Sequence, residues 1–494
     1  MAYVRKVPTA SGATAVQVVH KSHGEVIKLE HIGSAHNEAD LKTLLSLAKQ
    51  RLQGNQLAIF PNKQDHLHIY QRRSVPLLLY GCLKDLYCQL GFDELDDKIF
   101  ANLVIARIVE PTSKLDSIRV LSDLGIDDLR NTTIHRCLQR VVVNNYRDKL
   151  AKLCFSHASQ GAGITLVLYD VTTLYFEVQK EDEDDSDNKG YRKPGMSKER
   201  RLEPQIIVGL LVDQNGFPLE LHSFEGNKAE TKTILPVIEE FKKRHGLLGL
   251  TVVADAGMLS QANLEALDQA GYTYIVGSRM NKIPYDIAEY QKTKELTDNQ
   301  IITSKTAIPG QRIIYQYREK RAALDRRNIE KQIEKARKIV DGTTVAKKAK
   351  FLSVTTKQKT LNQALIDKAK ALAGIKGYVT NLPTKEASSN KVIAYYHELW
   401  HVEQSFRMSK SDLKARPIFH RKRDAIEAHL TVVMAALAMQ RVIEKRTKLS
   451  KKKFINTLKP LHSGLIVING ITYPTEPEIS KEIQQIIKAL KTRD

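Results

Sequence analysis

The spacing of apolar positions changes along the chain and divides it into segments. The chain opens with two strand-like runs and a helical stretch at 38–52. This pattern of apolar positions predicts that residues 1–70 form a small α/β module. Residues 71–157 show helical spacing interrupted by breaks such as Glu110-Pro111, which predicts a helical domain. Within it, a DNA-binding helix-turn-helix and a plain helical bundle fit the pattern about equally well.

Runs rich in Val, Ile and Leu begin at residue 164 and predict a sheet. The expected strands are 164–169, 206–212, 217–224, 250–254 and 272–276. Residues 213–216, with the sequence Asp-Gln-Asn-Gly, predict a hairpin turn between the second and third strands. Helical stretches at 231–244 and 261–269 follow, so we expect 158–282 to form the first part of a mixed α/β core.

The alternation of strands and helices is lost over residues 283–374, which carry Lys- and Arg-rich helical stretches and predict an inserted basic subdomain. Residues 375–446 are expected to complete the core with a short strand and two long helices, at 390–408 and 424–446. The segment 447–494 predicts a C-terminal tail that is first basic and then amphipathic.

Composition narrows the class of partner. A chain of 494 residues, 42% hydrophobic, predicts two to four globular domains. Its net charge of +21 favours a polyanionic partner such as nucleic acid. The four cysteines lack the spacing of a zinc or disulfide framework and are expected to be reduced core residues. With no long apolar run and no signal pattern, the protein is expected to be soluble and cytoplasmic, without a membrane.

Two of the expected strands lead directly into an aspartate. Asp170 follows the first strand and Asp255 follows the fourth, each where the strand is predicted to leave the core. Taken singly, either residue more simply starts a turn or caps a helix. Together, the two carboxylates favour a shared metal site.

A third carboxylate stands on the predicted helix 390–408. Tyr396, Glu403 and Lys410 recur at intervals of seven, which places them on nearly one line of a helix, and Arg407 and Lys414 are expected on the same face. A glutamate beside cations suits a site that binds divalent metal and phosphate. An exposed helix with ion pairs four residues apart explains Glu403 and Arg407 equally well.

These residues resemble a known signature. Tyr396-x2-Leu399-x3-Glu403-x6-Lys410 is similar to the Tyr-Arg-Glu-Lys signature of the insertion-sequence-four superfamily of bacterial DDE transposases. The resemblance extends in order over residues 164–440. Its other segments are Tyr169–Thr173, Gly190–Arg192, Pro204–Leu210, Glu225–Asn227 and Ala254–Met258. Leu399 replaces the signature's arginine, which suggests a divergent branch.

The resemblance implies a ribonuclease-H-like, retroviral-integrase-like core with an insertion between its second and third acidic residues, which the 283–374 segment fits. It implies that Asp170, Asp255 and Glu403 bind two Mg²⁺ ions, with Mn²⁺ as a substitute. Carboxylate oxygens are hard ligands that suit these metals and not zinc.

The resemblance also implies that the protein cuts the ends of its element and joins them to target DNA. Tyr396 and Lys410 would bind the terminal phosphates, with Arg407 as a substitute for the missing arginine and Lys414 beside it. The expected partners are the inverted repeats, the target DNA and a second copy of the chain on DNA. The protein would then associate with the nucleoid.

Rival hypotheses come from the same helix. His397-Glu398-Leu399-Trp400-His401 has the form of an HExxH zinc-protease motif, but no third-ligand extension follows it. A catalytically silent DNA-binding regulator on the same core is the second alternative, although the three carboxylates are intact.

Trp400 is expected to pack in the core. The acidic run 181–187 is expected to form a solvated loop, and the basic loop 191–198 either follows DNA or is solvated.

Overall fold

The computed structural model describes most of the chain. The described residues are 2–9, 12–22, 24–53, 69–127, 129–160, 163–178, 180–184, 190–196, 202–247, 249–257, 260–278, 280, 282–344, 349–354, 359–468 and 471–492. Its contacts divide it into two compact units. One unit comprises Met1–Tyr70 and Val467–Tyr473, and the other comprises Gln71–Ile466 and Pro474–Asp494.

The first unit contains an antiparallel sheet of order β1-β2-β3 followed by one helix. The elements are β1 (Ala2–Pro8), β2 (Thr14–Ser22), β3 (Glu25–Ala35) and α1 (Glu38–Gln53). Val16 and Val18 of β2 pack with Ala48 of α1 in a small core. The helical spacing at 38–52 therefore arises because α1 buries one face against the sheet.

The second unit begins with a helical region. Its elements are α2 (Leu77–Gln89), the 3-10 turn Phe92–Leu95, α3 (Lys98–Val109), α4 (Ser117–Asp123), α5 (Asn131–Val143) and α6 (Tyr146–Ser159). Asp97 caps α3 by accepting hydrogen bonds from the amides of Ile99 and Phe100, and it also pairs with Arg140 of α5 at 2.7 Å. The four cysteines are free, and three are buried as expected, but Cys88 is exposed, so that part of the prediction is wrong.

An eight-stranded mixed sheet, of order β10-β11-β14-β9-β8-β5-β6-β7, forms the centre of this unit. The strands are β5 (Leu166–Tyr175), β6 (Gln205–Asp213), β7 (Pro218–Glu225), β8 (Thr251–Ala254), β9 (Thr273–Ser278), β10 (Ile301–Lys305), β11 (Arg312–Tyr317) and β14 (Ile375–Thr380). Only the β5-β8 and β8-β9 pairs are parallel. Helices α7 (Ile234–His245) and α8 (Gln261–Gln269) connect the parallel strands, so the predicted mixed α/β core is confirmed.

The predicted hairpin turn is also confirmed. The amide of Gly216 donates to the carbonyl of Asp213 at 3.0 Å, between the antiparallel strands β6 and β7. Gly216 has a φ of +81°, a conformation that side chains disfavour, and this explains a glycine at the position.

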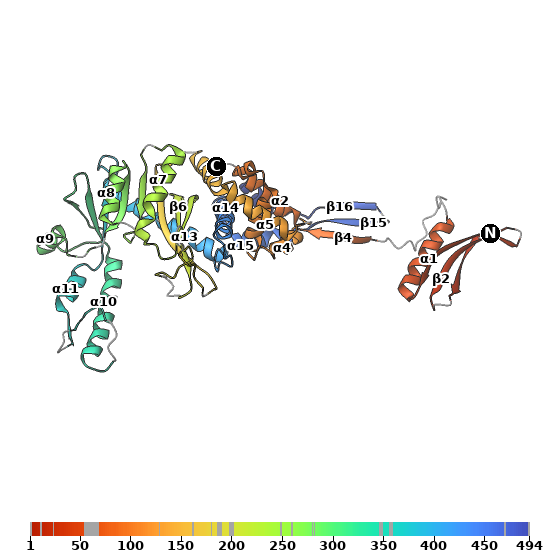
Figure 1. The fold of residues 1–494 in the computed structure, drawn as a ribbon, viewed down its shortest axis with the longest axis horizontal. Helices are drawn as coiled ribbons and strands as arrows, with labels where there is room; N and C mark the ends of the chain where they lie inside the picture. The colour runs from red at the N-terminus through yellow and green to blue at the C-terminus, as the bar shows by residue number, and fades with distance from the viewer. Residues whose placement is uncertain are drawn as a thin grey trace. The chain divides into compact units, whose positions relative to one another are not determined.

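The segment 283–374 divides its elements between the sheet and a separate lobe. Strands β10 and β11 extend the main sheet, because β11 pairs with β14 along its full length. The remaining elements are α9 (Tyr285–Thr293), α10 (Glu319–Val340), β12 (Leu352–Val354), β13 (Lys359–Leu361) and α11 (Gln363–Ala371). Figure 1 shows α10 and α11 side by side, and their own core includes Ile329, Ala336 and Phe351.

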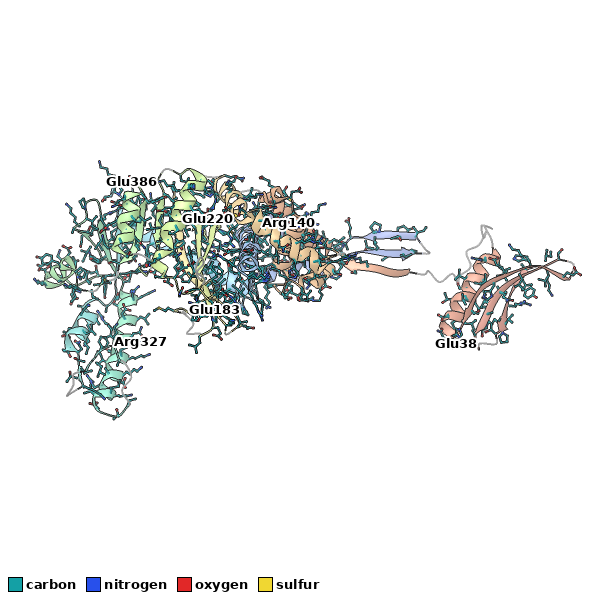
Figure 2. All side chains as sticks on the ribbon, in the orientation of Figure 1. Glu38, Arg140, Glu183, Glu220, Arg327 and Glu386 are labelled. Carbon is teal, nitrogen blue, oxygen red and sulfur yellow. The ribbon has the colours of Figure 1, made fainter. Side chains whose placement is uncertain are left out.

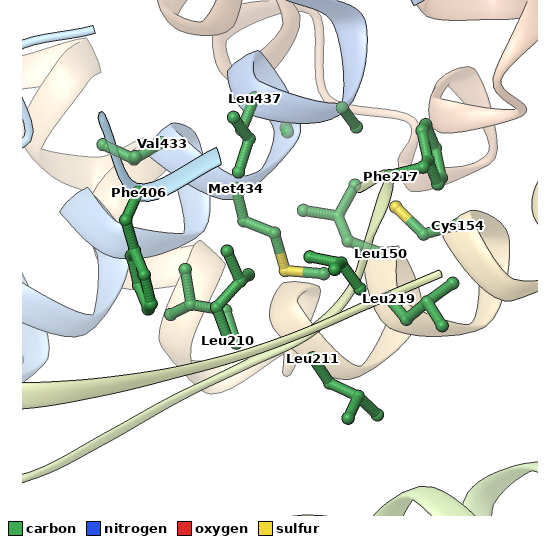
Figure 3. Packing of buried hydrophobic residues seen from close by; sticks show 14 of the residues in the cluster. Leu150, Cys154, Leu210, Leu211, Phe217, Leu219, Phe406, Val433, Met434 and Leu437 are labelled. Atoms are coloured by element: carbon green, nitrogen blue, oxygen red, sulfur yellow. The ribbon is translucent and has the colours of Figure 1, made fainter. Parts of the chain in front are cut away.

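Helix α14 (Arg423–Thr447) is the central core helix of the second unit. It is long and apolar enough to span a membrane, but 89% of its apolar window is buried inside the structure. Figure 3 shows Val433, Met434 and Leu437 of this helix packed near Leu210 of β6 and Phe406. The helix therefore joins the helical region to the sheet.

The rest of the chain adds short elements at the C-terminus. They are α15 (Lys451–Leu458), β15 (Ser463–Ile468), β16 (Ile471–Thr475) and α16 (Lys481–Lys491). Strand β4 (Ile69–Val75) completes a three-stranded sheet of order β16-β15-β4.

Candidate active site

The first two predicted carboxylates lie on adjacent parallel strands. In the register of β5 and β8, Tyr169 is opposite Ala254, so Asp170 and Asp255 take the next positions on neighbouring strands. Such strands lie about 4.8 Å apart, which brings the two aspartates side by side. Asp170 does not end its strand as predicted, because β5 continues to Tyr175 alongside β6.

The predicted helix 390–408 is broken. The chain forms α12 (Ser389–His397), then α13 (Trp400–Arg407), and then a π-helical turn (Met408–Asp412). At the junction, the amides of Leu399 and His401 bond to carbonyls three residues back, which tightens the helix. The interval of seven therefore does not place Tyr396, Glu403 and Lys410 on one line, and that prediction is wrong.

Tyr396 connects α12 to the end of β8. Only 4% of the residue is exposed, and its hydroxyl donates a 2.8 Å hydrogen bond to Oδ1 of Asp255. Burial raises the pKa of Tyr396, and the neighbouring Asp255 carboxylate raises it further. Gly277 of β9 makes room, since a β-carbon there would come within 2.6 Å of the hydroxyl. Tyr396 thus fixes the orientation of Asp255.

Glu403 is exposed on α13, which packs against β5 and β6. Its charge contributes, after that of Asp255, to raising the pKa of Tyr396. Among the described residues, no three acidic, histidine or cysteine side chains are already grouped to hold a metal. The structure therefore brings Asp170 and Asp255 side by side and leaves Glu403 on the neighbouring helix.

Lys376 of β14 is a further cation at this site that the sequence did not indicate. Its Nζ lies 4.3 Å from the centre of the Tyr396 ring, in a cation–π contact. Burial and Arg321 lower the pKa of Lys376, while Asp255 and Glu403 act to raise it. No acidic side chain among the described residues forms an ion pair with Lys376.

Arg441 of α14 holds α13 in place, and nothing in the sequence pointed to this role. Its Nε donates to the carbonyl of Gly216 at 2.8 Å, and its terminal nitrogens donate to the Gln404 side chain at 2.9 Å and to the carbonyl of His401 at 3.2 Å. Ser405 donates to the same Gly216 carbonyl at 2.8 Å. These bonds tie the helix that carries Glu403 to the β6–β7 hairpin.

The three cations predicted to contact DNA lie on three different segments: a helix, a π-helical turn and the loop that follows it. Arg407 is exposed at the end of α13, and Lys410 is half-buried in the π-helical turn. Lys414 lies beyond that turn with a φ of +45°, so it does not share a helix face with Arg407 as predicted. Leu399, in place of the signature arginine, is buried.

The HExxH segment does not form the helix of a zinc protease. The break between α12 and α13 falls inside the motif, and Nε2 of His401 lies 3.0 Å from the carboxylate of Glu398. Such a motif needs both histidines on one face of a continuous helix with the glutamate free. The prediction that Trp400 packs in the core is also wrong, since the residue is 52% exposed.

The acidic run pairs with the basic loop that follows it. Asp182 accepts a 2.8 Å hydrogen bond from Nε of Arg192, and Asp184 pairs with Lys193 at 3.0 Å. Arg192 is thereby engaged within the protein, whereas Asp182 is half-buried and Asp184 is exposed, as expected for a solvated acidic loop. Residues 185–187 and 197–198 lie outside the described residues.

Comparisons with known proteins identify the family. Among solved structures, the piggyBac transposase synaptic complex with hairpin DNA is 10% identical over 79% of this chain and 80% of that chain, with a TM-score of 0.38. The Mos1 transposase paired-end complex with the left transposon end is 14% identical over 47% and 66% of the respective chains, with a TM-score of 0.16. The curated proteins contain no match. The protein-family model described as "Transposase DDE domain" matches residues 161–439, more than half of the chain, and the chain therefore belongs to this family of transposases.

Proposed function

We propose that this transposase cuts the ends of its own insertion sequence and joins them to target DNA, with Asp170, Asp255 and Glu403 as the catalytic carboxylates. The observation that carries the proposal is the register of β5 and β8, which sets two aspartates side by side in a chain of the DDE family. Tyr396 adds support, because its hydroxyl already orients one of them. We assign the core to the ribonuclease-H-like class and the chain to a divergent branch of the insertion-sequence-four superfamily.

The donor set fits two Mg²⁺ ions, or Mn²⁺ in their place, because all three groups offer hard oxygen ligands. When bound, such ions supply an activated water or 3′-hydroxyl and stabilise the departing oxygen. Glu403 would complete the site from α13, which packs against β5 and on which its carboxylate is exposed.

The cations around the carboxylates would hold the DNA backbone. Lys376 would contribute from β14, Arg407 from the end of α13 and Lys410 from the π-helical turn, with Lys414 beyond that turn. Tyr396 could also reach a terminal phosphate, but only by sharing its hydroxyl with Asp255. Phosphate contacts of this kind position DNA without reading its sequence.

Transposition brings two ends together, so we propose a homodimer on DNA that binds the inverted repeats and then the target. The protein would act in the cytoplasm, associated with the nucleoid while it is bound to DNA. Its net charge of +21 supports this partner, because much of the affinity for DNA comes from counterion release.

The test is cleavage of a labelled duplex from the element's end in Mg²⁺. Asp170→Asn, Asp255→Asn and Glu403→Gln should each bind the duplex and fail to cut it, because each keeps its shape and loses a ligand charge. Glu386→Gln is the matched control, since Glu386 is an exposed glutamate next to α12 and should cut normally (Figure 2).

If the parent protein binds the duplex and never cuts it, the protein is a silent regulator and the proposal fails. Cutting by Glu403→Gln at the parent rate would remove Glu403 from the site and leave its role to another residue.

A further inference from the structure

A group of basic side chains lies away from the three carboxylates, where α3, α5 and α14 meet. Arg107 is in the last turn of α3, Lys114 follows that helix, and His429 is on α14. They are 6%, 9% and 5% exposed, respectively. Nζ of Lys114 lies 3.4 Å from Nδ1 of His429, and Nε2 of His429 lies 3.1 Å from the carbonyl of Ala415. Because a carbonyl only accepts, Nε2 carries the proton and Lys114 must be the donor to Nδ1.

Further basic groups surround this pair. The ring of His420 lies 5.6 Å from that of His429 and is half-buried, and His135 of α5 is exposed nearby. Burial lowers the pKa of Lys114 well below its ordinary value, and Arg107 lowers it further. Burial lowers the pKa of His420 to about 4, with Lys114, Arg107 and His135 adding to the effect. The cations Lys114 and Arg107 therefore oppose protonation of both His420 and His429.

The carboxylates nearest in sequence do not balance these charges. Glu110 and Asp116 flank Lys114 on either side, but both are paired with Arg119. Farther away, Asp97 is taken by Arg140. Among the described residues, no acidic side chain forms an ion pair with Arg107 or Lys114.

Two other buried cations, Lys451 and Arg441, have oxygen acceptors. Lys451 donates to the carbonyls of Ile108 and Asp412 at 3.1 and 2.6 Å, and Arg441 donates to several oxygen atoms. Arg107, by contrast, donates no hydrogen bond to any residue in the described part of the chain. Water still reaches its guanidinium nitrogens, which are not among the fully enclosed, unpaired polar atoms. A buried cation without an acceptor is costly and is normally paired.

We propose that Arg107, Lys114 and His420 form a binding site for a phosphate group. A guanidinium donates two parallel hydrogen bonds to phosphate oxygens, and an ammonium adds a compact charge beside it. His135 is the exposed member of the group and His420 is half-buried, so these two mark the side from which a ligand enters. The phosphate would come either from a DNA backbone or from free phosphate in solution, and both offer the same oxygen atoms.

The test uses the full chain and inorganic phosphate. Thermal unfolding is followed in about 20 mM phosphate and in chloride of equal ionic strength, where a specific site should raise the parent's melting temperature by about 5 °C. Arg107→Met and Lys114→Met keep the aliphatic stem and remove the charge, so each should lose this phosphate-dependent gain. Lys152→Met makes the same change on the exposed face of α6 and should keep it.

The proposal is overturned if phosphate gives the parent no gain over chloride, or if both variants keep the full gain. Calorimetric titration of the parent with inorganic phosphate does not depend on the variants folding, and an absence of binding there also overturns the proposal.

The source of the phosphate is decided with a short DNA duplex. If the site holds a backbone phosphate, Lys114→Met should lower the slope of log affinity against log salt by about one unit, because one fewer counterion is released. If it holds free phosphate, the slope is the same in the parent and the variant, and the thermal gain persists with DNA bound. Because the thermal test needs no cleavage, a failure of the proposed transposition chemistry would not affect it.

Discussion

The hydroxyl of Tyr396 donates a 2.8 Å hydrogen bond to Asp255. A tyrosine that the family resemblance assigned to phosphate binding thus orients a carboxylate that the same resemblance assigned to metal binding. The contact joins α12 to the end of β8 and brings the ring against Lys376. One side chain therefore connects the acidic and basic parts of the site.

Replacing Tyr396 with phenylalanine should weaken metal binding more than DNA binding. Loss of a group that orients a metal ligand typically lowers metal affinity by about 10- to 100-fold. Cleavage by Tyr396→Phe should therefore need a correspondingly higher Mg²⁺ concentration, with duplex affinity in Ca²⁺ unchanged. Tyr395→Phe, on the same helix, is the control. An unchanged Mg²⁺ dependence would show that the hydrogen bond has no role in the site.

Lys376→Met should reduce cleavage and lower the salt dependence of DNA binding by about one unit of slope, because one phosphate contact is lost. Lys391→Met, which removes another lysine packed on a tyrosine ring, should behave like the parent. Filter binding across a range of salt concentrations measures the slope. Equal slopes for Lys376→Met and the parent would exclude a phosphate contact at Lys376.

The sequence predicted the strands of the core and the family signature, because both are local patterns of residue type and spacing. It did not predict the break at Leu399, which depends on how α12 and α13 each fit the sheet. Lys376 and Arg441 were missed for a similar reason. Their roles come from contacts with residues far away in the chain, such as Tyr396 and Gly216.

Arg441→Met should destabilise the protein by about 3 kcal/mol, because the carbonyl of Gly216 and its neighbours lose a buried charged donor. Ser405→Ala removes one neutral hydrogen bond to the same carbonyl and should cost about 1 kcal/mol. Urea unfolding measures both. Equal losses for the two variants would contradict the assigned role of Arg441.

Stability should fall as the pH drops from 6.5 to about 4. Burial, with Lys114 and Arg107 beside it, lowers the pKa of His420 to about 4, so the folded protein resists protonation there while the unfolded chain takes up a proton below about 6.5. This contribution is fully present above pH 6.5 and is lost by pH 4, up to about 3 kcal/mol. Urea midpoints in phosphate-free buffer should show His420→Gln losing less stability than the parent over that range. Equal losses of stability in His420→Gln and the parent would contradict this role of His420.

The most direct test of the central claim is to replace one proposed metal ligand with a softer one. Asp255→Cys should not cut the end duplex in Mg²⁺, because a thiolate binds this hard ion poorly, and it should recover part of the cleavage in Mn²⁺ or Cd²⁺. DNA binding in Ca²⁺ verifies that the variant is folded. Recovery with the softer metals would show that residue 255 contacts the catalytic ion directly. Cleavage in Mg²⁺ at the parent rate would contradict the account.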